Sequence, residues 1–184
     1  MIEHITIRNF KSLGEVSVDL SPVTVLIGRS GVGKSNFLRA IRFLRNYLRY
    51  GEQAIGSEGG WNRIWPFGTV APLSFEVRFS LTGFDKAFEY RITWKNPARS
   101  PNQMLVSDEE FLFGGDVLFG RSMQTWTKWP GTGEGPSLLS RPYLGTFPTL
   151  SEAVLAYTAW TSGIGCFTPS STRIRSGTSS SRSA

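Results

Sequence analysis

The chain has 184 residues, of which 40% are hydrophobic and 18% charged, a composition typical of a globular protein with one sizeable core. It excludes a fibrous or wholly disordered chain. The sequence shows neither an apolar run of the roughly 20 residues that span a bilayer nor a signal segment, so we expect a cytoplasmic protein outside the membrane.

The cysteine content and the net charge limit the kinds of site and partner that the chain can have. The single cysteine, Cys166, excludes an internal disulfide and a zinc-binding cysteine cluster. The formal net charge of +6 favours an anionic partner, but half of it comes from three arginines in a tail without acidic residues: Arg173, Arg175 and Arg182. Charge alone therefore does not predict a nucleic-acid-binding surface on the folded body.

The chain opens with three strand patterns. Apolar and polar residues alternate over residues 5–7 and 16–20, as in half-buried strands that pair in a hairpin. Residues 23–27 (Val-Thr-Val-Leu-Ile) form an apolar run, which is typical of a fully buried strand. We therefore expect a hairpin followed by a buried strand.

A glycine-rich pattern, G-x-x-x-x-G-K-[ST], follows this apolar run at once and precedes a helical pattern. The glycines allow backbone N–H groups to surround the α- and β-phosphates of a nucleoside triphosphate. The lysine reaches the β- and γ-phosphates, and the final hydroxyl is a hard oxygen ligand for Mg²⁺. The alternative is a glycine-rich turn with a solvated lysine. The residues are Gly28, Arg29, Ser30, Gly31, Val32, Gly33, Lys34 and Ser35, with Ser35 as the metal ligand.

A helix with one apolar and one basic face is expected after this loop. Its apolar positions are Phe37, Leu38, Ile41, Leu44, Tyr47 and Leu48, and its basic positions are Arg39, Arg42, Arg45 and Arg49. A solvated surface is the simpler interpretation of the arginines, and contact with nucleic acid phosphates is the alternative.

An aromatic cluster follows the loop expected over residues 51–60: Trp61, Trp65 and Phe67, with Arg63 between them. Aromatic rings beside an arginine can stack on bases. They can also cover the edge of a core, and we favour this interpretation because a globular chain must place its large apolar side chains somewhere.

An antiparallel meander is expected next. Apolar residues alternate with polar ones over residues 73–81 and 88–94, with a turn at 82–86. The meander continues through residues 103–112, 117–121 and 123–129, with a turn at Gly114-Gly115-Asp116.

The C-terminal part changes character. Thr149 and Glu152 form a capping-box pattern that predicts a short helix ending near Gly163. Residues 168–184 are rich in serine, threonine, arginine and glycine, with too few apolar groups to offset the entropy of ordering. We therefore expect one domain over residues 1–167 and a disordered tail over 168–184.

The N-terminal third carries a family resemblance. Residues 5–13 (Ile-Thr-Ile-Arg-Asn-Phe-Lys-Ser-Leu), 23–27 and 35–41 (Ser-Asn-Phe-Leu-Arg-Ala-Ile) resemble the N-terminal half of RecF/SMC-type ABC ATPase heads, an AAA-annotated class. The resemblance implies an α/β, partial P-loop NTPase fold and ATP bound with Mg²⁺ between two heads. It also implies a bacterial role in DNA repair, chromosome organisation or anti-phage defence.

The resemblance extends the predicted site beyond the glycine loop. It implies that residues 9–12 lie beside the nucleotide with Lys11 near phosphate, and that Asn36 adds to the nucleotide-binding residues. The alternative for residues 9–12 is a turn that merely ends a strand.

Several motifs of a complete RecF/SMC-type ATPase head are not recognisable in this sequence. The nearest imitation of a Walker B strand, residues 104–109 with Asp108 and Glu109, lies inside the expected antiparallel meander, so we assign it no catalytic role. The single histidine, His4, lies on the first strand and cannot be a switch histidine. Without a carboxylate to position water, ATP hydrolysis by this chain alone should be weak.

Two functions follow as hypotheses. The chain is the ATP-binding front half of a DNA-linked head, or a non-catalytic ATP-binding module that completes another subunit's head. An ABC transporter ATPase is disfavoured by residues 9–12. An incomplete α/β layer exposes apolar sheet surface, so we expect self-association or a partner subunit, with DNA a partner by resemblance alone.

Overall fold

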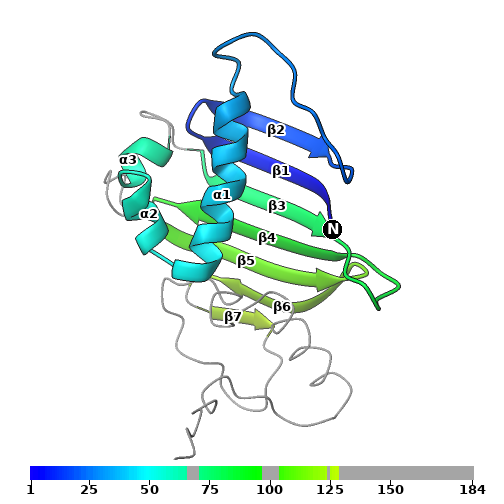
Figure 1. Cartoon of the computed structure of the whole chain (residues 1–184). Coiled ribbons are helices and arrows are strands. Elements are labelled where there is room, and N and C mark those ends of the chain that lie inside the picture. Colours follow the sequence, from blue (N-terminus) through cyan, green and yellow to red (C-terminus); the bar gives the residue numbers. More distant parts are fainter. Residues whose placement is uncertain (66–70, 97–103, 124, 129–184) are drawn as a thin grey trace, which may run out of the picture.

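The computed structural model describes residues 1–65, 71–96, 104–123 and 125–128. Within these ranges an antiparallel sheet has the strand order β2-β1-β3-β4-β5-β6-β7, and α1 crosses one face (Figure 1). The strands are β1 (Ile2–Phe10), β2 (Leu13–Asp19), β3 (Leu73–Phe79), β4 (Phe88–Lys95), β5 (Leu105–Phe113), β6 (Asp116–Ser122) and β7 (Thr125–Lys128). The helices are α1 (Lys34–Tyr50), α2 (Gln53–Ser57) and α3 (Trp61–Ile64). The helix expected after Thr149 and the tail lie outside the described residues.

The segments in which apolar and polar residues alternate form strands, as predicted. Every second residue of β3 is buried, and β4 pairs with it in register, with Val77 opposite Tyr90. The other face is charged, and Arg91 lies there within ion-pair distance of Glu76, Glu89 and Glu110. One apolar face and one solvated face are typical of an antiparallel sheet.

The predicted hairpin and turn are also confirmed. β1 and β2 pair antiparallel, with Ile7 opposite Val16. Gly114 and Gly115, at φ 58° and 91°, form the two-residue connection between β5 and β6. Positive φ at both positions is what a type I′ hairpin turn requires, and glycine adopts it without a steric penalty.

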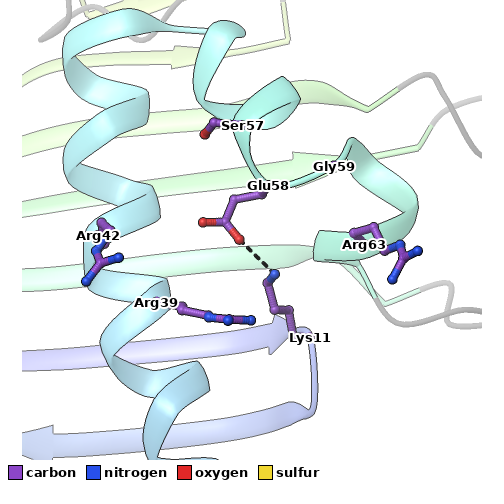
Figure 2. Close-up of a pocket in the computed structure, with 7 residues that line it drawn as sticks. All are labelled: Lys11, Arg39, Arg42, Ser57, Glu58, Gly59 and Arg63. Carbon is purple, nitrogen blue, oxygen red and sulfur yellow. Dashed lines mark hydrogen bonds and ion pairs between the residues drawn. The ribbon is translucent and has the colours of Figure 1, made fainter.

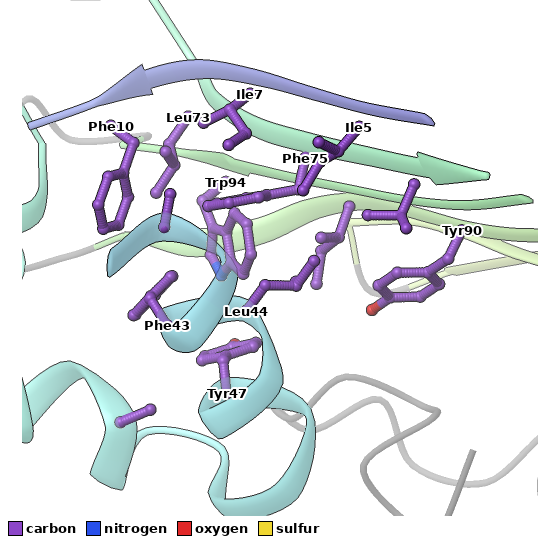
Figure 3. Close-up of a cluster of buried hydrophobic side chains, with 14 of the residues drawn as sticks. Ile5, Ile7, Phe10, Phe43, Leu44, Tyr47, Leu73, Phe75, Tyr90 and Trp94 are labelled. Carbon is purple, nitrogen blue, oxygen red and sulfur yellow. The ribbon is translucent and has the colours of Figure 1, made fainter. Parts of the chain in front are cut away.

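The core lies between α1 and the sheet, and Trp94 is at its centre (Figure 3). Phe43 of α1 packs against Phe75 and Trp94, and the Tyr47 ring lies edge-on to Trp94 at 5.0 Å between centroids. Trp61 joins this cluster at 6.1 Å from Trp94. The core-edge interpretation of Trp61 is therefore correct, whereas Phe67 lies outside the described residues.

The predicted buried strand over residues 23–27 is wrong for this structure. The pairing of β2 with β1 runs on to Leu20, whose N–H donates to Glu3 O at 2.7 Å, and the chain then leaves the sheet edge as an arch toward α1 (Figure 1). Val23, Val25 and Ile27 are 80%, 73% and 90% exposed. A strand buried on both faces needs neighbours, and no strand of the described sheet borders this segment.

Two further expectations are corrected. The segment 51–60, predicted as a loop, contains α2, and α3 begins directly after it. The described sheet is antiparallel throughout, so it confirms the meander but not the α/β, ABC-head-like arrangement around a strand before the glycine loop. In the described residues, no helix is long and apolar enough to cross a membrane.

Candidate nucleotide-binding site

The glycine-rich loop turns the chain from the edge of the sheet into α1. Gly33 is the residue before the helix, at φ 100°, and Gly33 O accepts the first helical bond from Phe37 N at 2.9 Å. Lys34 and Ser35 therefore stand in the first turn of α1, directly against the loop. The predicted order of loop and helix is confirmed.

Lys34 folds back over the beginning of the loop. Its Nζ donates to Gly28 O and to Arg29 O, each at 2.6 Å. These bonds use two of the three N–H donors of the ammonium group, and the third can meet an anion. The carbonyl groups at the start of the loop therefore fix the position of the Lys34 ammonium group.

The first turn of α1 adds to this positive potential. It contains no acidic side chain, and no side chain caps its N–H groups. Ser35 is exposed at this end of the helix. Uncapped N–H groups and the positive end of the helix dipole favour an anion here, and the Ser35 hydroxyl can ligate a divalent cation that accompanies it.

The turn between β1 and β2 supports the loop from one side. Asn36 Nδ2 donates to Ser12 Oγ at 2.7 Å, which joins the turn to the first part of α1. Asn9 Nδ2 holds the turn to Pro72 O at 2.7 Å. Residues 9–12 therefore lie beside the first part of α1, and Ser12 makes the contact.

Lys11 points to a different group. Its Nζ lies 2.7 Å from Glu58 Oε2, and the two side chains are only 14% and 17% exposed. Its backbone is anchored by a bond from Lys11 N to Ile64 O at 2.6 Å. The structure thus places Lys11 between β1 and the segment that joins α2 to α3, with its charge paired.

Gly33 is the tightest position of the loop. A Cβ at Gly33 would lie 2.9 Å from Leu13 Cδ2 at φ +100°, whereas a Cβ at Gly31, at φ +84°, meets nothing within 4 Å. We expect Gly33→Ala to lower the free energy of unfolding by about 1–3 kcal/mol more than Gly31→Ala, because both strain the backbone but only the first also crowds Leu13. Chemical denaturation of the two variants measures the difference. Equal losses of unfolding free energy in the two variants would show that crowding of Leu13 does not affect stability.

Glu109 is part of a buried ion pair. Arg121 Nε donates to Glu109 Oε2 at 2.7 Å, and the Tyr90 hydroxyl donates to Glu109 Oε1 at 2.8 Å. Burial first, and then the Glu109 carboxylate, raise the pKa of Tyr90, so its hydroxyl stays protonated as a donor. This carboxylate therefore joins β4 and β6 to β5 through the Tyr90 hydroxyl and the Arg121 guanidinium.

Asp108 is engaged on the opposite face of β5. Partial burial pushes the pKa of Asp108 up, but hydrogen bonds from Ser107 and Ser122 and the nearby Lys95 ammonium outweigh this, so the pKa lies below its ordinary value. Both carboxylates of the Walker B-like segment thus have hydrogen-bond partners within the sheet.

The single histidine also has a structural environment. His4 Nδ1 lies 2.7 Å from Asp19 Oδ1, and His4 Nε2 lies 3.1 Å from Thr6 Oγ1 on the β1–β2 pair. Across the described ranges, no three His, Cys, Asp or Glu side chains gather as a metal site.

Sequence reasoning missed two contacts that shape this region. The Lys11–Glu58 pair joins residues 47 positions apart, and the Ser12–Asn36 bond joins residues 24 positions apart. No local periodicity predicts such contacts. The available signal was the three polar residues around the strand end, Asn9, Lys11 and Ser12, which would be costly to leave beside a helix without partners.

Comparison with known proteins shows which family the first half of the chain resembles. The sequence model of the family described as AAA ATPase domain matches residues 1–102. The DNA replication and repair protein RecF of Pseudarthrobacter chlorophenolicus is 46% identical over 44 residues, which are 23% of this chain and 11% of RecF. RecF of Lactobacillus acidophilus is 43% identical over 44 residues, 23% of this chain and 12% of that protein.

A second type of relative matches the same share of the chain. Endonuclease GajA of Bacillus cereus is 44% identical over 41 residues, which are 22% of this chain and 7% of GajA. The similar segments thus span about a tenth of these relatives or less.

Proposed function

The chain belongs to the AAA ATPase domain family, and from this membership we propose that residues 28–36 bind ATP with Mg²⁺ as the nucleotide-binding part of an ATPase linked to DNA repair or defence. The observation that carries the proposal is the position of Lys34. Its ammonium group is held by Gly28 O and Arg29 O over the loop, with one donor left for a phosphate oxygen.

Each part of the loop has a role in this proposal. Backbone N–H groups around Gly31 and Gly33 bind the α- and β-phosphates, and Lys34 binds the β- and γ-phosphates. Ser35 holds Mg²⁺, which offsets phosphate charge when bound. Asn36 fixes the helix through Ser12. Lys11 is not needed, because Glu58 holds its charge.

We further propose that hydrolysis by this chain alone is slow. Phosphoryl transfer to water depends on a group that positions the nucleophile. The Asp108 and Glu109 carboxylates are bound by Ser122, Arg121 and neighbouring groups of the sheet, so we infer that they do not serve this purpose. The positioning group then comes from residues outside the described ranges or from another polypeptide.

A second candidate function is favoured by one observation. Val23, Val25 and Ile27 are exposed directly before the loop, although their pattern is that of a strand buried on both faces. A module that completes the head of another subunit would cover them. Under this alternative the chain binds ATP without hydrolysing it, and turnover appears only with the partner.

ATP binding by the Lys34→Ala variant tests the proposal. We expect Mg²⁺-dependent binding by the unaltered chain and about 10–100-fold weaker binding by the variant, because one or two charge-assisted bonds to phosphate are lost. Isothermal titration calorimetry gives both affinities. Lys86→Ala, at an exposed lysine outside the loop, is the matched control and should bind normally.

Two results would contradict the assignment of the loop. Equal affinity in the unaltered chain and Lys34→Ala would show that ATP binds without the lysine. An equal loss in Lys86→Ala would show that overall charge, rather than the position of Lys34, determines the affinity.

A further inference from the structure

A hollow of about 810 Å³ lies between the β1–β2 turn, α1 and the segment that joins α2 to α3 (Figure 2). Its charged lining consists of four cations and one carboxylate: Lys11, Arg39, Arg42, Arg63 and Glu58. None of its lining residues belongs to the glycine-rich loop. We propose that this hollow is a second anion site that binds the phosphodiester backbone of a nucleic acid, with Glu58 competing for Lys11.

The charge of the hollow is the first argument. The carboxylate is already paired with Lys11, so the lining has an excess of three positive charges. Arg39 and Arg42 are exposed on α1, Arg63 is exposed on α3, and Arg39 extends toward Lys11 (Figure 2). Guanidinium groups from two elements that line one hollow offer several donors for phosphate oxygens.

The chemistry of the lining points to backbone phosphates rather than to a nucleotide. A pocket for a base has apolar or aromatic walls, but the lining here is charged or polar apart from Gly59. Trp61, the aromatic residue of α3, is packed against Phe43 and Trp94 instead of facing the hollow as a free stacking platform. Contacts of this kind position a nucleic acid without reading its sequence.

The length of the basic surface favours a polymer over a small anion. Arg45 and Arg49 continue the exposed basic face of α1 beyond Arg42. At a rise of 1.5 Å per residue, the ten steps from Arg39 to Arg49 span about 15 Å. One strand of a duplex has a phosphate for about every 3.4 Å of its axis, so this row matches several phosphates.

Glu58 gives the site an internal competitor. Its carboxylate lies 2.7 Å from Lys11 Nζ in a largely shielded position. Phosphate can recruit the full charge of Lys11 only when this pair opens, and the carboxylate also repels an approaching phosphodiester. Glu58 therefore lowers the affinity of the hollow for a phosphodiester, and removal of its charge should raise this affinity.

Binding of a short DNA duplex of random sequence to the full chain tests this proposal by fluorescence anisotropy over a series of NaCl concentrations. We expect Arg39→Gln/Arg42→Gln to weaken binding roughly tenfold and to reduce the slope of log K against log salt by about two. We expect Glu58→Gln to strengthen binding. Arg78→Gln/Lys86→Gln, which removes two exposed charges outside the hollow, is the matched control.

The variants also separate this site from the ATP site. Arg39→Gln/Arg42→Gln should still bind ATP, and Lys34→Ala should still bind DNA without ATP, so the two proposals can fail independently. An equal loss of DNA binding in the control, or unchanged binding in Arg39→Gln/Arg42→Gln, overturns the hollow as the site. Weaker binding by Glu58→Gln overturns the competition. A poly-glutamate peptide that binds as tightly as the duplex overturns the phosphodiester assignment.

Discussion

Replacing Arg121 with methionine is expected to lower the free energy of unfolding by about 3–5 kcal/mol. Arg121 and Glu109 are both buried, and the guanidinium donates to the carboxylate at 2.7 Å. The variant leaves the Glu109 charge inside the sheet without its cationic partner, and the Tyr90 hydroxyl does not replace that charge. Chemical denaturation followed by tryptophan fluorescence measures the loss, which is a large fraction of the stability of a single domain.

Two further variants show whether the loss comes from an uncompensated charge. Glu109→Gln/Arg121→Met removes both charges and should recover part of the stability of the single variant. Arg8→Met breaks the exposed pair with Glu15, which lies at 2.9 Å, and should cost less than about 1 kcal/mol. If Arg121→Met is no more destabilised than Arg8→Met, the buried pair does not stabilise this sheet.

The second large effect concerns the association state of the chain. We expect the unaltered chain to form oligomers in size-exclusion chromatography and Val25→Lys/Ile27→Lys to shift it toward the monomer. Val25 and Ile27 are 73% and 90% exposed, and burial of each such side chain is worth about 1.5–3 kcal/mol. With lysine at both positions, association would bury two charges, which costs free energy instead of gaining it.

A matched pair of substitutions controls for added charge. Leu105 and Met123 are also apolar and are 41% and 49% exposed, but they lie on and beside the later strands. Leu105→Lys/Met123→Lys should therefore leave the oligomers unchanged. A monomeric unaltered chain that binds no hydrophobic dye would contradict the idea that residues 23–27 need a covering partner.

Local patterns predicted the elements whose formation depends on neighbours in the sequence. Alternation over residues 73–79 and 88–94, with a turn between them, was sufficient for β3 and β4 because a hairpin brings its own partner strand. Residues 23–27 have an equally clear apolar pattern but no adjacent hairpin partner. Their pattern indicates a preference for burial, and the neighbour that would provide it is not part of the described sheet.

The same limit applies to the candidate site. The motif identified the loop, its lysine and its serine, because all of them lie within one turn and the first part of a helix. The environment of Glu109 was not predictable, since a carboxylate after an apolar run suits both a Walker B strand and a buried ion pair. The ion pair depends on the register between β5 and β6, which brings Arg121 opposite Glu109.

The strand order also has a consequence for the sequence of folding events. β1 pairs with β3, and Ile5 lies opposite Val77 in this pair. In the sequence, the glycine-rich loop and all of α1 lie between these two strands. The pairs from β3 to β6 are hairpins between successive strands, so they close short loops, whereas the β1–β3 pair must close a long one. On the ribosome, α1 emerges before Trp94, the residue against which Phe43 packs. The helix that carries the lysine is therefore seated only after the strands that follow it have been made.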